Sequence, residues 1–372
     1  MTALRQESAD SPALELRAYL AGILPGFRAR WGMAESFEAG LAWQQLMAAG
    51  GWAAPSWPVA AGGRGLDVLD RVRCDAELAR VDAPAMAGVL GLQNVGPALF
   101  MFGTEAQKAS LPRILTGEEI WTQGFSEPGA GSDLAGLQTR AVREGDEFVV
   151  NGQKIWTSTG MQGTHMMLLV RTDPQAARHR GISVLLVPLD SPGIDRRPLR
   201  QLTGESDFAE VFFTDVRVPV SHLLGPLDEG WRVTMATLGY ERTGVISMAA
   251  ALQREVEVLV GGMTVEDPML RDEVTRRWMD ARLTGLLGAR ALARLGDGGN
   301  PGPEQSVIKL AWSRTLSDLG ETLMRAAGPA GLLADDAGAR RFLRSRASTI
   351  AAGTTEVMKN LLAEQVLGLP KG

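Results

Sequence analysis

The chain has 372 residues, of which 45% are hydrophobic and 22% are charged, and its formal net charge is -5. This composition is typical of a soluble globular protein with two or three packed domains, and it excludes a disordered or fibrous chain. The sequence contains no basic block that could neutralise phosphates, so nucleic acid is not an expected partner.

Cysteine and histidine are too scarce for disulfide or metal chemistry. Cys74 is the only cysteine, and His165, His179 and His222 are scattered without a metal-ligand spacing, so we expect no metal site. The first ten residues carry no export or transit signal, which indicates a cytoplasmic protein. Glycine, proline and amide residues interrupt the uncharged run 83–104, which favours buried helices joined by a turn over a membrane span.

Helical spacing of apolar residues dominates from residue 13 to about residue 117. It is clear in the segments 37–47 and 68–79. Between these two segments, residues 51–65 are rich in glycine and proline and cannot continue a helix. The sequence therefore predicts an N-terminal helical domain.

Beyond Trp121 the apolar period changes to two, which is the period of a strand. Asn151-Gly152 predicts a tight hairpin turn, because this dipeptide is typical of such turns. We therefore expect a small antiparallel β domain. Its predicted strands are 139–143, 148–150, 154–158, 166–171, 182–188 and 210–218.

Helical spacing returns at residue 228 and predicts helices at 228–260, 267–295, 303–326 and 353–366. Long amphipathic helices with short connections indicate an antiparallel bundle. The expected fold class is α+β. Its expected domains are an N-terminal helical domain (1–119), a middle antiparallel β domain (120–226) and a C-terminal four-helix bundle (227–372).

Several nucleotide-binding and hydrolase motifs are missing. The sequence has no G-x-x-x-x-G-K-[ST], no G-x-G-x-x-G between a strand and a helix, and no G-x-S-x-G, which disfavours a Walker ATPase, a Rossmann dehydrogenase and an α/β hydrolase. The glycines of segment 129–133 let the backbone approach a flat or phosphorylated ligand closely. An ordinary turn would have the same composition.

Further short motifs accompany this glycine-rich segment along nearly the whole chain. Together they resemble acyl-CoA dehydrogenases, and the helical, β, helical order matches that family. The motifs are Trp57-Pro58, 62–65, 102–108, 111–114, 117–118, 126–133, 151–158, Gly230-Trp231, Glu241-Arg242, 353–356 and 367–370.

The resemblance implies FAD-dependent desaturation of an acyl-CoA thioester. A base removes the proton alpha to the thioester carbonyl, the flavin takes a hydride from the beta carbon, and electrons leave to an electron-transfer flavoprotein. It also implies a homotetramer, or a heteromer with a related chain. An acyl-CoA oxidase, an acyl-carrier-protein dehydrogenase and a non-catalytic subunit that completes another chain's flavin site remain alternatives.

The resemblance also assigns roles to residues of the β domain. Ser132 contacts the pantetheine arm, Trp156 packs on the isoalloxazine, and Ser158 bonds near its reactive nitrogen. A flat aromatic side chain and small hydroxyls suit those tasks, although Trp156 would also suit the core beside a hairpin. The further flavin-lining positions are Gln123, Phe125 and Ser126.

The base has two candidate positions. Many family members carry a glutamate directly before the Gly-Thr of the tail, where this chain has Ala352. Others place it in a Glu-Arg pair on the first long C-terminal helix, which Glu241-Arg242 resembles. Helical geometry sets Glu241 about 60° from Leu238 on an apolar stripe, where burial suits a general base. Arg242 then holds substrate or orients Glu241; the alternative is an ion pair that fixes helix packing.

The chain also departs from the family pattern at the residues expected to contact the phosphates of the cofactor. Family members often have an Arg-x-x-Phe-Gly segment after that helix, but residues 260–269 contain no arginine. Arg325, close to Gly328, is the expected substitute and Arg271 a weaker one, with a solvated helix face as the alternative.

The C-terminal tail also matches family positions. Thr354 and Glu356 correspond to FAD contacts, and Gly353 to a substrate contact at the start of the last helix. An ordinary glycine break before a helix is the alternative.

Overall fold

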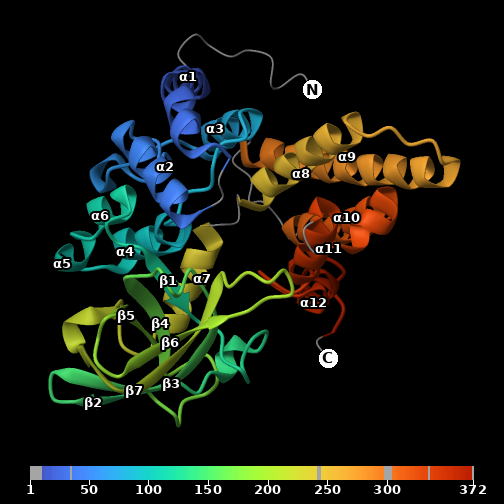
Figure 1. The fold of residues 1–372 in the computed structure, drawn as a ribbon. Helices are drawn as coiled ribbons and strands as arrows, with labels where there is room; N and C mark the ends of the chain where they lie inside the picture. Colours follow the sequence, from blue (N-terminus) through green and yellow to red (C-terminus); the bar gives the residue numbers. More distant parts are fainter. Residues whose placement is uncertain (1–10, 34–35, 241–243, 297–303, 334–335, 371–372) are drawn as a thin grey trace. The chain divides into compact units, whose positions relative to one another are not determined.

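The computed structural model describes residues 11–33, 36–240, 244–296, 304–333 and 336–370 (Figure 1). These residues form two compact units. The first contains the described residues up to 67 together with 83–201 and 205–240, and the second contains 68–82, 202–204 and the described residues from 244 onward. The expected order of helices, sheet and helices is confirmed.

The helices α2 (Phe37–Ala49) and α5 (Glu105–Lys108) begin at local capping signals. The Ser36 hydroxyl accepts a 3.2 Å hydrogen bond from the Ala39 amide at the start of α2, and Thr104 and Gln107 form a reciprocal capping box at the start of α5, as these residue types favour. The buried Gln44 amide joins α2 to the Gly88 N–H and the Ile114 carbonyl. The helices are α1 Pro12–Trp31, α2 Phe37–Ala49, α4 Gly96–Phe102, α5 Glu105–Lys108, α6 Leu111–Thr116 and α7 Gly230–Tyr240.

Within the uncharged run 83–104, the π-helix η2 (Gly91–Val95) continues directly into α4 (Gly96–Phe102). The Trp57 indole donates a 2.9 Å hydrogen bond to the Leu92 carbonyl and anchors this segment. The expectation of buried helices is confirmed, although no turn separates them. Across the described ranges, no helix combines the length and apolarity that a membrane crossing requires.

The middle of the chain forms an eight-stranded sheet within the described residues, in the order β6-β7-β3-β2-β4-β5-β8, with β1 paired to β4 (Figure 1). The sheet is mixed, because β1 and β4 pair in parallel and β2 meets β4 in parallel at one position. The other strand pairings of the domain are antiparallel, as expected. The strands are β1 Trp121–Gly124, β2 Arg140–Glu144, β3 Glu147–Ser158, β4 His165–Arg171, β5 Ile182–Pro188, β6 Ile194–Leu199, β7 Phe208–Pro219 and β8 Leu223–Leu224.

The predicted hairpin turn at Asn151-Gly152 is also wrong, because β3 runs unbroken through it. The Asn151 side chain instead bonds across to Asp215 on β7, and the pairing shifts by a bulge between Val150 and Gly152. The turn between β2 and β3 lies at Gly145, where φ is 64°.

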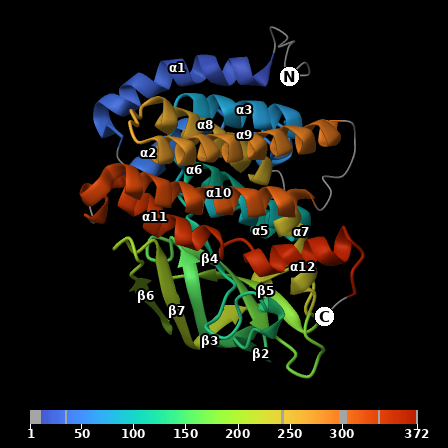
Figure 2. The same ribbon diagram turned by 90° about the vertical axis from the view of Figure 1, so that its right-hand side faces the viewer.

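The second unit is a helical bundle, as expected, and Figure 2 shows α10 and α11 side by side. Its core joins Ile246, Ala249 and Ile308, and separately Leu252 and Leu319. The described residues of the predicted helix 228–260 lie in α7, which belongs to the first unit, and in α8 of the second, and residues 241–243 lie outside the described ranges. The helices are α3 Val68–Arg80, α8 Gly244–Gly261, α9 Pro268–Gly296, α10 Glu304–Ala327, α11 Ala337–Ser348 and α12 Thr355–Gln365.

Candidate functional site

The glycine loop leaves the sheet at Gly124, the last residue of β1. The Glu127 and Ala130 backbones close a tight turn through mutual N–H to carbonyl bonds of 3.1 and 3.0 Å. A Cβ at Gly129 or Gly131 would have no atom within 4 Å. The loop therefore offers free backbone on its outer side, as a ligand that approaches closely requires.

Trp156 lies near the end of β3 in a left-handed backbone conformation, with φ of 60°. The pairing of β3 with β7 is irregular between Lys154 and Thr157, and 56% of the Trp156 side chain is exposed. Its ring meets the edge of Phe208 at 5.9 Å. The structure therefore does not support a core role for Trp156. Strained, exposed aromatic residues are typical of functional positions.

The loop and this part of β3 are hydrogen-bonded to each other. The Ile155 N–H donates a 3.0 Å bond to the Ser126 carbonyl. Of the positions expected to line the flavin, the structure thus brings Ser126 and Phe125 next to the segment that carries Trp156 and Ser158, while Gln123 lies on the adjoining strand β1.

Two buried polar atoms near this segment lack a protein partner in the described part of the chain, namely Gln123 Nε2 and Thr157 Oγ1. Buried polar groups are rarely left unpaired, because the loss of hydration is costly. A flat ring edged with hydrogen-bond donors and acceptors, such as an isoalloxazine, has the kind of edge groups that pair such atoms and the kind of face that an exposed indole covers. The residues present therefore fit a flavin.

Sequence reasoning missed three residues here. Thr157 is buried with an unpaired hydroxyl, and Lys154 and Glu127 form a buried ion pair with 2.8 Å between Nζ and Oε1. The sequence signal for this pair was a lysine within a predicted strand beside apolar positions. A lysine that is buried in this way needs a partner of opposite charge.

This ion pair shifts the titration of both side chains. Burial lowers the pKa of Lys154 to about 8, although the nearby Glu127 charge opposes the shift. Burial also acts to raise the pKa of Glu127, but the charge and hydrogen bond of Lys154, with hydrogen bonds from Thr139 and Gln138, lower it overall. Both side chains are therefore charged at neutral pH.

Ser132, the expected thioester contact, is exposed at the far end of the loop. Its neighbour Asp133 pairs with Arg178, and the Arg171 guanidinium donates a 2.7 Å bond to the Ala135 carbonyl. The loop end is thus fixed to the last residue of β4 and to the segment after it, while Ser132 stays accessible.

The tail motif lies in the second unit and begins after α11. Ala352 and Gly353 have φ of 54° and 96°, and the Thr354 hydroxyl caps α12 by accepting a bond from the Val357 N–H. The last helix therefore begins at Thr355 with Thr354 as its N-cap, and not at Gly353. Glu356 lies in its first turn, where a negative charge is favourable.

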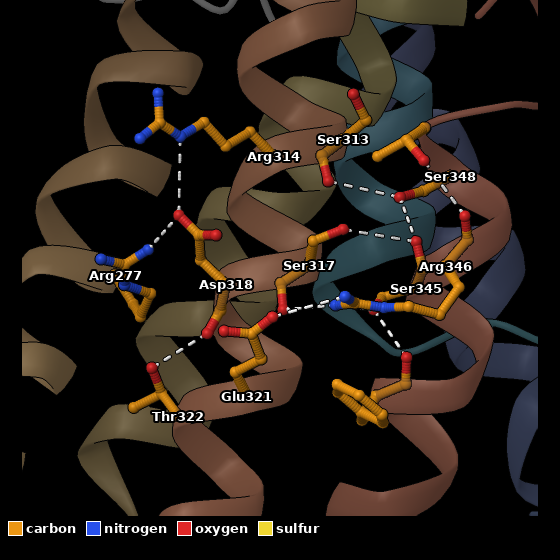
Figure 3. Close-up of polar contacts among 12 residues, drawn as sticks. Arg277, Ser313, Arg314, Ser317, Asp318, Glu321, Thr322, Ser345, Arg346 and Ser348 are labelled. Carbon is orange, nitrogen blue, oxygen red and sulfur yellow. Dashed lines mark hydrogen bonds and ion pairs between the residues drawn. The ribbon is translucent and has the colours of Figure 1, made fainter. Parts of the chain in front are cut away.

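A polar network behind the tail holds α11 against α10 (Figure 3). The Ser348 hydroxyl donates to the Ser345 carbonyl and to the Ser313 carbonyl, and Arg346 donates a 2.9 Å bond to the Ser317 carbonyl. These bonds fix the end of α11, from which the tail departs.

A second polar cluster on α10 reaches α9 through Asp318. Its carboxylate lies between Arg277, at 2.5 Å, and Arg314, at 3.7 Å (Figure 3). Charge and hydrogen bonds therefore join α10 to α9 through Asp318 and to α11 through Ser313 and Ser317.

Arg325 is engaged with another helix. Its guanidinium pairs with Glu273 of α9 at 2.5 Å, and 60% of its side chain is exposed. Gly328, with φ of 58°, follows the end of α10. Glu241 and Arg242 lie outside the described residues. In the described ranges, no group of three or more His, Cys, Asp or Glu side chains could hold a metal ion.

Comparison with known proteins gives one consistent match. Profiles of the N-terminal, middle and C-terminal domains of acyl-CoA dehydrogenases match residues 13–118, 122–216 and 228–367. Acyl-CoA dehydrogenase IpdE1 of Mycobacterium tuberculosis is 41% identical over 379 residues, which cover 96% of this chain and 97% of the relative.

Solved structures agree with the sequence comparison. The Tcur3481-Tcur3483 steroid ACAD is 30% identical with a TM-score of 0.86, and the match covers 99% of each chain. The ChsE4-ChsE5 complex of Mycobacterium tuberculosis is 29% identical with a TM-score of 0.81, and the match covers 99% of this chain and 100% of that one. This chain therefore belongs to the acyl-CoA dehydrogenase family, whose members are FAD-dependent oxidoreductases that act on acyl-CoA thioesters.

Proposed function

We propose that this chain is the catalytic subunit of an acyl-CoA dehydrogenase that desaturates a steroid-derived CoA thioester, with Glu241 as the base. The observation that carries the catalytic assignment is the strained, exposed Trp156 beside two buried polar atoms that lack partners. The substrate class rests on likeness to the Tcur3481-Tcur3483 steroid ACAD over the whole chain.

FAD, when bound, accepts the hydride from the beta carbon. The protein's own residues hold and orient it: Gln123, Ser126, Thr157 and Ser158 supply hydrogen-bonding groups, and Trp156 covers ring surface. The Phe125 backbone lines the ring beside them.

The substrate is held and deprotonated by other residues. Ser132 binds the pantetheine arm, and Glu241 accepts the alpha proton while Arg242 orients it or the thioester. Alanine at position 352 leaves Glu241 as the carboxylate for this task. Gly353 contributes a substrate contact from the tail.

The remaining FAD contacts follow the family resemblance. Thr354 and Glu356 contact the cofactor from the tail. Arg325 supplies the positive charge that segment 260–269 lacks, and Gly328 contacts the cofactor close to it. Because Arg325 pairs with Glu273, this role requires Arg325 to exchange that partner for a phosphate.

The subunit assembles with an identical or a related chain, up to a tetramer. An apolar stripe on α9, formed by Met279, Leu283 and Leu286, is half or more exposed, and these positions share one helix face. Such a stripe is typical of a subunit interface. The two-part names of the Tcur3481-Tcur3483 and ChsE4-ChsE5 structures favour a related chain as the partner.

Three broader assignments complete the proposal. Electrons pass to an electron-transfer flavoprotein, the protein acts in the cytoplasm, and its domains are 1–119, 120–226 and 227–372. Flavin reoxidation in air without that acceptor would identify an oxidase instead.

A second candidate is a subunit that completes the flavin site of a related chain without its own chemistry. Ala352 in place of a glutamate and the lack of arginine in 260–269 favour it. Glu241 argues against it.

Anaerobic flavin reduction tests the proposal and separates the candidates. The purified chain is titrated with short, branched, long and steroid-derived CoA thioesters while flavin absorbance is followed. We expect bleaching with the steroid-derived thioester, and flavin retention without bleaching in Glu241→Gln. A purified chain without flavin supports the partner-subunit candidate, and parental bleaching by Glu241→Gln disproves the assigned base.

A further inference from the structure

We propose that Lys154 is a positioning residue for the flavin, which holds the glycine loop 125–133 and the Trp156 segment in one fixed arrangement with Glu127 as its counterion. The inference rests on the proposed flavin site at this loop. Neither Lys154 nor Glu127 contacts the cofactor in this proposal; both act through the backbone of residues that do.

Lys154 connects two points of the loop. Its ammonium donates a 2.9 Å hydrogen bond to the Phe125 carbonyl and a 2.8 Å bond to Glu127 Oε1. The side chain is completely buried. On the next residue, the Ile155 N–H bonds to the Ser126 carbonyl. Two successive residues of β3 therefore fix two successive carbonyls of the flavin loop.

Glu127 extends this connection to the residues that lead into β2. Its carboxylate accepts bonds from the Gln138 N–H at 2.6 Å and the Thr139 N–H at 2.8 Å. Both oxygens of the carboxylate are thereby used, and the start of the loop, the approach to β2 and β3 are tied to one ion pair. A single proton or charge change at this pair affects all three together.

Stability alone does not explain the pair. Replacing a buried ion pair by apolar side chains of similar size is often neutral or stabilising, so apolar packing would serve a merely structural purpose. The pair instead lies two residues from Trp156, whose φ of 60° persists only if its surroundings fix it. Lys154 and the Ile155 N–H provide that fixation on the loop side.

Charge is required for the arrangement, and this gives it a pH signature. The charged groups that face Lys154 are Glu127 and Arg171, and the Lys154 pKa is about 8. Above that pH the ammonium loses its proton and its attraction to Glu127. FAD affinity should therefore fall as the pH rises through about 8, while Glu127 stays ionised.

The test compares Lys154→Met with the control Lys108→Met, because Lys108 pairs with Glu105 at the surface. We expect Lys154→Met to raise the FAD Kd on the order of tenfold or more, the scale that supporting contacts show for metal ligands. Its flavin absorption bands should shift, and the rise of Kd near pH 8 should vanish. Lys108→Met should match the parental protein in all three.

A second measurement uses the protein without FAD. Hydrogen exchange at the Gln138, Thr139 and Ile155 amides should quicken in Glu127→Gln and in Lys154→Met, and not in the control. If Lys154→Met does not fold, the double variant Glu127→Gln/Lys154→Met, which removes both charges, takes its place.

The outcomes separate this inference from the proposed function. A folded Lys154→Met or double variant with parental FAD Kd, spectrum and pH dependence overturns the positioning role. A parental protein that binds no FAD overturns the proposed flavin site itself.

Discussion

The Lys309 ammonium, on α10, donates a 2.7 Å hydrogen bond to the Ser348 carbonyl at the last residue of α11. A cation at a helix C-terminus pairs a carbonyl that has no partner within the helix. Burial lowers the pKa of Lys309, so the contact carries a cost that the paired carbonyl must offset.

Replacing this lysine should loosen the tail. Lys309→Met leaves the buried Ser348 carbonyl without its partner, and we expect a loss of about 1–3 kcal/mol in the free energy of unfolding. Urea denaturation measures it, with the exposed Lys359→Met as the control. Equal stability of the two variants would contradict the assignment.

Gly152 should not tolerate a side chain. A Cβ at this position would lie 2.5 Å from Thr139 Oγ1 and 2.7 Å from the Thr139 Cα, which is backbone. Gly152→Ala should therefore cost about 1–3 kcal/mol in thermal or urea unfolding. Gly22→Ala, which has open space in α1, should be stabilising by about 0.5–1 kcal/mol. If Gly152→Ala were more stable than Gly22→Ala, the close approach of Gly152 to Thr139 would be ruled out.

Trp156 should matter for the cofactor and not for folding. Trp156→Gly relieves a left-handed backbone strain of about 1–2 kcal/mol, which offsets the lost edge contact with Phe208. The free energy of unfolding of the FAD-free variant should stay within about 1 kcal/mol of the parental value. Its flavin absorbance and its FAD affinity should change. Val142→Ala, another exposed apolar position in the sheet, should change neither. If the flavin absorbance and the FAD affinity of Trp156→Gly were unchanged, the isoalloxazine would not lie against Trp156.

Acid should remove the stabilisation that Glu127 provides. The pKa of Glu127 in the folded protein is below the ordinary value of 4.5. At pH values between the folded and the unfolded pKa, the folded state therefore binds fewer protons than the unfolded state. The contribution is complete above pH 4.5 and is lost as the pH falls through the folded pKa.

The comparison with Glu127→Gln makes this measurable. At pH 7 the variant should lose about 3 kcal/mol, because one partner of a buried pair is removed. The difference from the parent should shrink in denaturation at acid pH. Glu105→Gln, in an exposed ion pair, should stay close to the parent at both pH values. A Glu127→Gln deficit that does not change with pH would show that ionisation is irrelevant.

The apolar stripe on α9 should decide the size of the assembly. Leu283→Gln with Leu286→Gln should reduce the particle mass in sedimentation velocity, because polar side chains would be buried without partners in the interface. Val59→Gln, an exposed apolar position in the first unit, should leave the mass unchanged. An unaltered mass in the α9 variant would place the interface on another surface.

Local patterns predicted most of the fold. The strand 182–188 coincides with β5, and the segment 267–295 matches α9 within one residue at each end, because both have a clear apolar period. The Asn151-Gly152 turn failed because cross-strand bonds from Asn151 to Asp215 outweigh the local turn preference. The parallel pairing of β1 with β4 joins segments about 40 residues apart, which no local pattern encodes.

The candidate site was predicted in part. Family resemblance identified Ser126 and Trp156, and the structure places their segments in hydrogen-bond contact. Lys154 was passed over, because inside a strand it has the same polarity as a solvent-facing lysine. Its place beside apolar strand positions is a weak signal, and only the complete burial of its side chain and its 2.8 Å distance to Glu127 identify it as one partner of an ion pair.

The helix α3 has a consequence for how the polypeptide matures. It belongs to the bundle, where Asp75 accepts a 2.6 Å hydrogen bond from Ser247 on α8, 172 residues later in the chain. At the usual rates of translation the ribosome needs about ten to thirty seconds to add that many residues. During this interval α3 has been synthesised but α8 has not, so the bundle can form only late in synthesis. A fragment that starts at α8 would lack α3, one of the helices of the bundle.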